Sequence, residues 1–262
     1  MTDWLHVTEG TAPLIVSVPH AGTDIPGEIT GLLSLARHDA DHHVGKLYAL
    51  AREMGATIIE TDVSRSVIDV NRDPSGASLY PGQATTGLCP VETFAGEPLY
   101  SDGQEPEGQE ITRRRTRYFD PYHAALNAQI ARLRSLQPAV ILYDAHSIRS
   151  HVPRLFEGEL PLFNIGSFGG ASCAPALSDA VANQCAGHSH IVNGRFKGGW
   201  ITRHYGNPAG GVHAIQMELA MRGYLDEAGD WPPTWDAARA SALQPILRQI
   251  LTACLSFAKD QK

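Results

Sequence analysis

Two apolar stretches, each ending in a histidine, constrain the fold of this chain more than any other feature. Residues 139–147 read Ala-Val-Ile-Leu-Tyr-Asp-Ala-His-Ser, and residues 13–20 read Pro-Leu-Ile-Val-Ser-Val-Pro-His. Short apolar runs of this kind are typical of buried strands in the centre of a parallel sheet. Open α/β sheets bind their ligands outside the carboxyl ends of such strands. We therefore expect His20 and His146 at one ligand-binding edge of an α/β sheet.

Length, charge and cysteine usage narrow the class of protein. No linker-like stretch divides the 262 residues, so we expect one domain over 1–262. The net charge of −7 argues against a nucleic-acid partner but allows a small anionic substrate held by a few arginines. The four cysteines form no C-x-x-C pair, and the chain shows neither a signal peptide nor an apolar run of membrane-spanning length. The expectation is a cytoplasmic protein with no membrane partner.

The remaining pattern predicts helices alternating with strands, interrupted by two irregular regions. The regions 73–107 and 193–211 are rich in glycine, and the first is either a functional lid or a hidden hairpin. Apolar periodicity and breakers predict helices at about 39–53 with Asp39 as N-cap, 111–136 interrupted at Asp120–Pro121, 176–186 and 234–258. Extended segments are predicted at 56–60, 66–72, 160–165 and 213–219.

The histidine pair suggests a metal centre. Catalytic zinc sites commonly use two histidines and one carboxylate and leave a position for water. The carboxylate is either Asp41, at the start of the helix that follows His20, or Asp24 in the loop between them. We favour Asp41, because a helix start fixes the direction of its side chain.

Several neighbours of these candidates could also take part in the metal centre. The middle metal ligand could also be a residue within one turn of Asp41, namely Asp39, His42 or His43. Asp144 precedes His146 by two residues, so in a strand the two side chains share a face, and Asp144 could orient the imidazole.

A single carboxylate and several arginines complete the set of candidates for chemistry. Glu218 lies in the apolar run 213–219 and could act as a general base toward water, or it could simply face solvent. Arginine suits bidentate binding of a carboxylate, and Asn71-Arg72 ends one of the predicted extended segments. Further candidates for binding an anionic substrate lie in loops: Arg149, Arg195 and Arg203.

Five motifs together resemble those of the N-formylglutamate amidohydrolase family. No single motif is specific, but their order and spacing are, and they extend from about residue 13 to the Gln-Met-Glu-Leu segment at 216–219. The motifs are Ser-Val-Pro-His-Ala-Gly (17–22), Asp-Ala-Asp-His-His-x-x-x-Leu-Tyr (39–48), Asp-Val-Asn-Arg-Asp-Pro (69–74), Asp-Ala-His-Ser (144–147) and Asn-Gly-Arg-Phe-Lys-Gly-Gly-Trp-Ile-Thr-Arg-His-Tyr-Gly (193–206).

The resemblance implies a fold and a set of site residues. The family is similar in architecture to zinc carboxypeptidases, aspartoacylase-like deacylases and zinc cell-wall amidases. This implies a central mixed, mostly parallel sheet flanked by helices, with one zinc or another divalent ion at its edge. His20 and His146 would be the first and last metal ligands, and Glu218 the catalytic carboxylate. Asn71-Arg72 matches the Asp-x-Asn-Arg element that holds a substrate carboxylate in aspartoacylase-like enzymes.

One departure from the related enzymes concerns the middle metal ligand. Carboxypeptidases and aspartoacylases carry H-x-x-E, whereas the third residue after His20 is Thr23. The cell-wall amidases take their glutamate from the following helix, and this analogy favours Asp41.

The activity that the resemblance implies is zinc-dependent hydrolysis of N-formyl-L-glutamate to formate and L-glutamate, the terminal step of histidine degradation. The alternatives are a related hydrolase for another N-acyl amino acid or short peptide, and a catalytically silent binding module with the same fold. The presence of Glu218 together with both histidines counts against the silent module.

Overall fold

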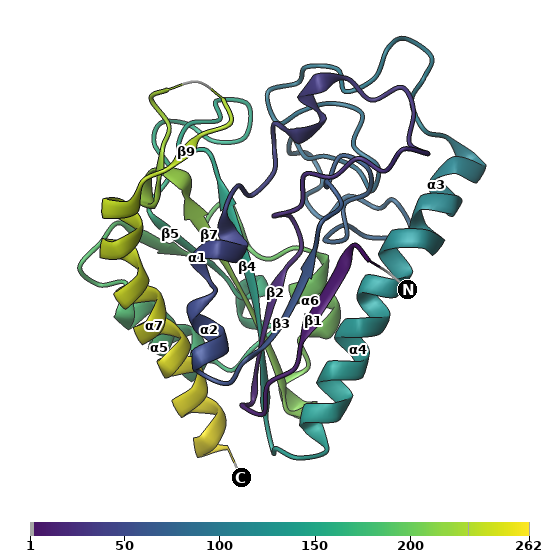
Figure 1. Cartoon of the computed structure of the whole chain (residues 1–262). Helices are drawn as coiled ribbons and strands as arrows, with labels where there is room; N and C mark the ends of the chain where they lie inside the picture. The colour runs from purple at the N-terminus through teal and green to yellow at the C-terminus, as the bar shows by residue number, and fades with distance from the viewer. Residues whose placement is uncertain (1–2, 230, 262) are drawn as a thin grey trace.

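A seven-stranded mixed sheet forms the centre of the protein (Figure 1). The structure, a computed structural model, describes residues 3–229 and 231–261. The strand order is β1-β3-β2-β4-β7-β5-β6, with β1–β3 and β5–β7 antiparallel and the other neighbouring pairs parallel. The strands are β1 Leu5–Thr8, β2 Leu14–Val18, β3 Thr57–Thr61, β4 Val140–Ile148, β5 Phe163–Gly166, β6 His190–Val192 and β7 Val212–Ala220; a separate two-stranded ribbon consists of β8 Leu225–Asp226 and β9 Thr234–Trp235.

Helices cover both faces of the sheet (Figure 1). Apolar residues of α1 Val44–Leu47, α2 Leu50–Glu53, α5 Pro175–Gln184 and α7 Ala237–Asp260 pack in one core. Residues of α4 Asp120–Arg134 and α6 Trp200–Tyr205 pack in a second core on the opposite face. The remaining helical elements are α3 Gly108–Arg114, a π-helical turn at Arg115–Phe119 and short 3₁₀ turns at Ser34–Arg37, Phe168–Gly170, Pro208–Gly210 and Met221–Gly223. None of the helices in the described ranges is both long and apolar enough to cross a membrane.

The two histidine-terminated apolar stretches form adjacent parallel strands, as predicted. Every residue of β2 and β4 is buried, because helices cover the sheet on both sides. His20 follows β2 by two residues, and His146 lies in β4, two residues before the end of the strand. In the β4–β7 ladder His146 is directly opposite Glu218. Three sequence-distant side chains therefore reach the same edge of the sheet.

The predicted helix over 39–53 is wrong in extent. Its region contains only the two one-turn helices α1 and α2, and Asp41 precedes the first of them. His43, the residue before α1, has φ 62°, a left-handed conformation that cannot continue a helix. The Asp41 N–H instead donates to the His20 carbonyl at 2.9 Å, and this bond joins the two segments that carry the candidate ligands.

Two other predicted elements also differ from the structure. Residues 66–72 form buried turns rather than an extended segment, because their backbone closes locally through bonds such as Arg72 N–H to Asp69 O. The helix over 111–136 is not interrupted at Asp120–Pro121. The wider π-helical turn at 115–119 leads directly into α4, and the backbone stays helical through Pro121 in the first turn of α4.

The prediction that residues 73–107 and 193–211 are irregular is confirmed in part. Region 73–107 contains no helix or ladder strand in the part of the chain that the structure describes, only isolated bridges such as Glu92 with Pro98. Residues 91–99 nevertheless form a minimal hairpin, in which the Leu99 N–H donates to the Val91 carbonyl at 2.9 Å and the Thr93 N–H donates to the Glu97 carbonyl at 2.8 Å. The hairpin alternative therefore holds for this short stretch of the region. Region 193–211, predicted to be irregular throughout, contains the short helix α6.

Candidate metal and active site

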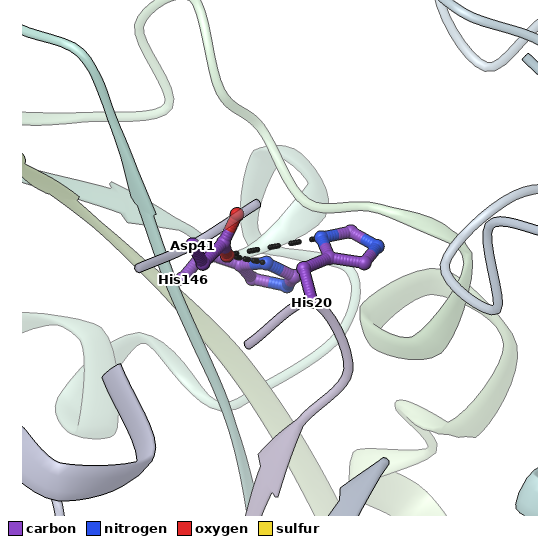
Figure 2. A group of neighbouring side chains, drawn as sticks. All are labelled: His20, Asp41 and His146. Carbon is purple, nitrogen blue, oxygen red and sulfur yellow. Dashed lines mark hydrogen bonds and ion pairs between the residues drawn. The ribbon is translucent and has the colours of Figure 1, made fainter. Parts of the chain in front are cut away.

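Three buried side chains converge at the carboxyl edge of β2 and β4 (Figure 2). The Nδ1 atom of His146 lies 3.1 Å from Oδ2 of Asp41, and Nδ1 of His20 lies 3.8 Å from the same oxygen. The backbone N–H of Ser147 donates to that oxygen at 3.1 Å and fixes the carboxylate. One ligand atom from each of His20, Asp41 and His146 falls within 4.8 Å of the others.

The chemistry of this group fits a divalent metal ion. Nδ1 of His20 and Oδ1 of Asp41 are buried, and neither has a hydrogen-bond partner in the described ranges. Buried polar atoms without partners cost free energy, so such atoms point to a ligand. Two imidazole nitrogens and a carboxylate are the donor set of many catalytic zinc sites. We therefore assign the group of His20, Asp41 and His146 as a candidate metal centre.

Each imidazole is also held from its far side by a carboxylate. Nε2 of His20 lies 2.7 Å from Asp69 Oδ1, and Nε2 of His146 lies 2.9 Å from Asp144 Oδ2. This arrangement orients both Nδ1 atoms toward Asp41 and is typical of metal-binding histidines. The sequence suggested Asp144 for this role and missed Asp69, which lies 49 residues from His20 in the chain.

Asn71, a predicted substrate-binding residue, belongs to the same buried network. Its Nδ2 donates to Asp144 Oδ2 at 2.8 Å, and its Oδ1 accepts the backbone N–H of Ile201 at 2.7 Å. Asn71 also lines the cavity beside the metal centre.

The two candidate histidines have opposite electrostatic environments. Burial, assisted by the charge of Arg65, lowers the pKa of His20 to about 4. Burial acts in the same direction on His146, but the carboxylates of Asp144 and Asp41 outweigh it and raise the pKa of His146 well above its usual range. This environment favours the protonated form of His146, so that a metal ion bound there would have to displace a proton.

The alternative candidates for the middle metal ligand lie outside the cluster of His20, Asp41 and His146. Asp24 is exposed, and its N–H donates to the Asp62 carbonyl. Asp39 accepts hydrogen bonds from Arg149 and from the backbone of Phe94. The rings of His42 and His43 contact Trp231 and Trp235, respectively, and neither histidine lines the cavity beside the metal centre.

We predict that Asp41→Ala loses the bound metal, whereas Asp24→Ala retains it. The reason is that, of these two aspartates, Asp41 brings a carboxylate oxygen into the cluster with His20 and His146, whereas Asp24 does not. The measurement is metal content per chain after gel filtration, with thermal unfolding to establish that both variants fold. Metal loss in Asp24→Ala with full occupancy in Asp41→Ala would move the middle ligand into the loop.

Glu218 faces the same cavity from β7. Its side chain is buried, and Oε2 accepts a hydrogen bond from Gln216 Nε2 at 3.2 Å. The Gln216 amide is itself fixed, because its Oε1 accepts the N–H of Gly199 at 2.7 Å. Burial raises the pKa of Glu218 to about 8. A carboxyl group with its pKa near neutrality is suited to both accepting and returning a proton.

Of the four arginines predicted to bind the substrate, two line the cavity and two lie outside its wall. Arg72 and Arg195 line the cavity, whereas Arg149 and Arg203 do not. Arg149 donates to Asp39, and Arg203 donates to the carbonyls of Gly198 and Leu79.

A further cavity-lining arginine, Arg65, was missed at the sequence level. Its guanidinium is buried and donates to Asp69 Oδ2 at 2.6 Å, and its Nη1 lies 3.6 Å from Asp41 Oδ1. Its position in a turn with no periodic pattern gave no signal.

Comparison with known proteins identifies the family. A family model described as N-formylglutamate amidohydrolase matches residues 12–225. The chain belongs to this family. Proteins named N-formylglutamate deformylase from Pseudomonas putida and Pseudomonas aeruginosa PAO1 are 45% and 43% identical to it. The alignments cover 97% of this chain and 96% of the first relative, and 100% of this chain and 99% of the second.

Solved structures share the fold of this N-formylglutamate amidohydrolase family member. The crystal structure of N-formylglutamate amidohydrolase from Ralstonia eutropha JMP134 matches with a TM-score of 0.82 and 23% identity, covering 97% of this chain and 98% of the other. A gene product from Agrobacterium tumefaciens matches with a TM-score of 0.72 and 18% identity, covering 97% and 96%. The family resemblance and the α/β fold expected from the sequence are thus confirmed.

Proposed function

We propose that this protein hydrolyses N-formyl-L-glutamate to formate and L-glutamate, using one divalent metal ion, zinc by preference. The observation that carries the proposal is the buried His20–Asp41–His146 group, whose two histidines line one cavity together with Glu218, Arg65, Arg72 and Arg195. The two Pseudomonas relatives are named N-formylglutamate deformylase, and these names support N-formyl-L-glutamate as the proposed substrate. By the family resemblance, the reaction would be the terminal step of histidine degradation.

In this proposal the protein residues have distinct roles. A metal held by His20, Asp41 and His146 would supply a Lewis acid for the activation of water and the polarisation of a carbonyl. Glu218 would accept the proton of the water that attacks the formyl carbon and would return it to the leaving amine nitrogen. The buried guanidinium of Arg65 would donate to the formyl oxygen as negative charge develops there.

The decisive experiment combines metal analysis with a formate-release assay. We expect the purified protein to contain about one metal ion per chain, to lose formate release from N-formyl-L-glutamate after chelation, and to regain it on addition of Zn²⁺. Metal-loaded protein that releases no formate from this substrate would contradict the proposed function.

The fixed guanidinium of Arg72 leads us to predict that it binds the α-carboxylate of the substrate. Its Nε and Nη2 atoms donate to the carbonyl and hydroxyl of Thr86 at 2.9 and 3.1 Å, which fixes the plane of the guanidinium. We expect Arg72→Lys to lose roughly 10- to 100-fold in kcat/KM for N-formyl-L-glutamate, because an ammonium cannot reproduce a bidentate contact with a carboxylate. The loss should be smaller for the analogue whose α-carboxylate is an amide.

The matched control is Arg115→Lys. Arg115 is exposed and forms a surface ion pair with Asp120, so its substitution should leave the kinetics unchanged. Equal losses on both substrates in Arg72→Lys would show that Arg72 does not bind the α-carboxylate.

A further inference from the structure

A short part of the irregular region 73–107 is tied to the site by three arginines. We call residues 79–86 the Tyr80 segment. Arg203 Nη1 donates to the carbonyl of Leu79 at 2.8 Å, Arg195 Nη2 donates to that of Ala84 at 2.7 Å, and Arg72 Nε donates to that of Thr86 at 2.9 Å. Residues of the segment line the same cavity as Glu218 and the metal centre. The segment is therefore part of the cavity wall.

Tyr80 is the central contact of this segment. The guanidinium carbon of Arg195 stands 5.2 Å from the centroid of its ring, and that of Arg203 stands 4.8 Å from it. The Tyr80 hydroxyl donates to the carbonyl of Gly198 at 3.1 Å and accepts the N–H of Lys197 at 3.2 Å. Tyr80 thus joins the segment to the Gly-rich stretch that carries Arg195.

Arg195 is a half-buried cation without an acidic partner. It forms no ion pair with any residue in the ranges 3–229 and 231–261, and its Nε and Nη2 donate only to the carbonyls of Leu155 and Ala84. Burial lowers the pKa of its guanidinium, so the charged form is not fully compensated. A cation in a cavity wall that forms no ion pair is suited to an anionic ligand.

Arg72 and Arg195 differ in their contacts with the residues that hold the metal centre. Arg72 Nη1 lies 3.7 Å from Asp69, the carboxylate bonded to His20. The guanidinium of Arg195 instead contacts the carbonyls of Leu155 and Ala84 and the rings of Tyr80 and Phe196. In N-formylglutamate the α-carboxylate is closer to the formyl group along the molecule than the side-chain carboxylate is. The first therefore fits Arg72, and the second fits Arg195.

We propose that Tyr80 is a positioning residue that holds Arg195 against the side-chain carboxylate of the substrate, so that it selects N-acyl amino acids with an acidic side chain. This inference rests on the proposed function and goes beyond it. The ring of Tyr80 restricts the guanidinium plane without neutralising its charge, as cation–π contacts do. A carboxylate binds best to a guanidinium whose orientation is fixed before the ligand arrives.

The test compares N-formyl-L-glutamate with N-formyl-L-glutamine, which has the same shape and no side-chain charge. We expect Tyr80→Ala to raise KM for N-formyl-L-glutamate by about 10-fold with little change in kcat, since a desolvated cation–π contact is strong enough to account for a change of this size. The kinetic constants for N-formyl-L-glutamine should stay unchanged. Tyr80→Phe keeps the ring and should restore most of the discrimination.

Two further variants separate positioning from general structural damage. Phe168 also stacks on Arg203, at 4.7 Å, but it is exposed and does not line the cavity, so Phe168→Ala should leave discrimination unchanged. In an Arg195→Gln background, Tyr80→Ala should cause no further loss of discrimination. Equal losses on both substrates in Tyr80→Ala, or additive losses in the double variant, would overturn the proposal.

A separate readout distinguishes this proposal from the proposed function. If the metal-loaded wild type releases no formate from either substrate, the proposed function fails. The Tyr80 proposal is then tested by calorimetry, in which Tyr80→Ala should weaken the binding of L-glutamate and leave that of L-glutamine unchanged. Equal binding of L-glutamate by wild type and Tyr80→Ala would refute it.

Discussion

Replacement of His146 by alanine is expected to abolish both metal binding and formate release. His146 contributes one of the two imidazoles of the candidate metal centre, and its Nδ1 lies 3.1 Å from Asp41. With His20 and Asp41 alone, the site would lack a ligand on the β4 side. Metal content per chain and formate release from N-formyl-L-glutamate would be measured on the same preparation.

The His146→Ala variant should still fold, which keeps the experiment interpretable. The buried carboxylate of Asp144 retains hydrogen bonds from Ser17 and Asn71, at 3.0 and 2.8 Å. Asp41 retains the N–H of Ser147. His213 provides the matched control, because it is a buried histidine in β7 five register positions away, and His213→Ala should keep its metal. Full metal occupancy in folded His146→Ala would refute the assignment of the metal centre.

The sequence was sufficient to predict the part of the site that lies on regular strands. Apolar runs predict the buried strands β2 and β4, and parallel pairing then brings His20 and His146 to one edge without any knowledge of the loops. Each of these inferences depends on a local pattern and on one general rule of sheet topology. Glu218 is less determined, because its run 213–219 leaves the side chain either as a base or facing solvent until the β4–β7 register places it opposite His146.

The rest of the site depends on contacts that no local pattern predicts. Asp69 and Arg65 lie in buried turns, and their partners are 49 and 24 residues away in the chain, at His20 and Asp41. The helix predicted over 39–53 fails because the Asp41 N–H bonds to the His20 carbonyl and His43 takes a left-handed conformation. These departures concentrate around the candidate ligands, where tertiary contacts override helix propensity.

The second large effect is expected from Glu218→Gln, which should reduce kcat by about 10²–10⁴-fold while metal binding is retained. Glutamine keeps the shape of the side chain and cannot accept a proton from water. The substitution should also be tolerated by the fold, because burial raises the pKa of Glu218 to about 8 and the metal-free protein near neutrality already carries the uncharged acid. KM should change far less than kcat, since the lost interaction belongs to the transition state.

Glu60 supplies the control for this last experiment. It is a partly buried carboxylate of β3 whose pKa burial also raises, and it does not line the cavity that contains Glu218. Glu60→Gln should therefore retain kcat, although it replaces a comparable carboxyl group in the same sheet. If Glu218→Gln loses its metal, Glu218 is a ligand rather than a base. If kcat stays near that of the wild type, the proton acceptor must be another group, and the case for Glu218 as the catalytic base fails.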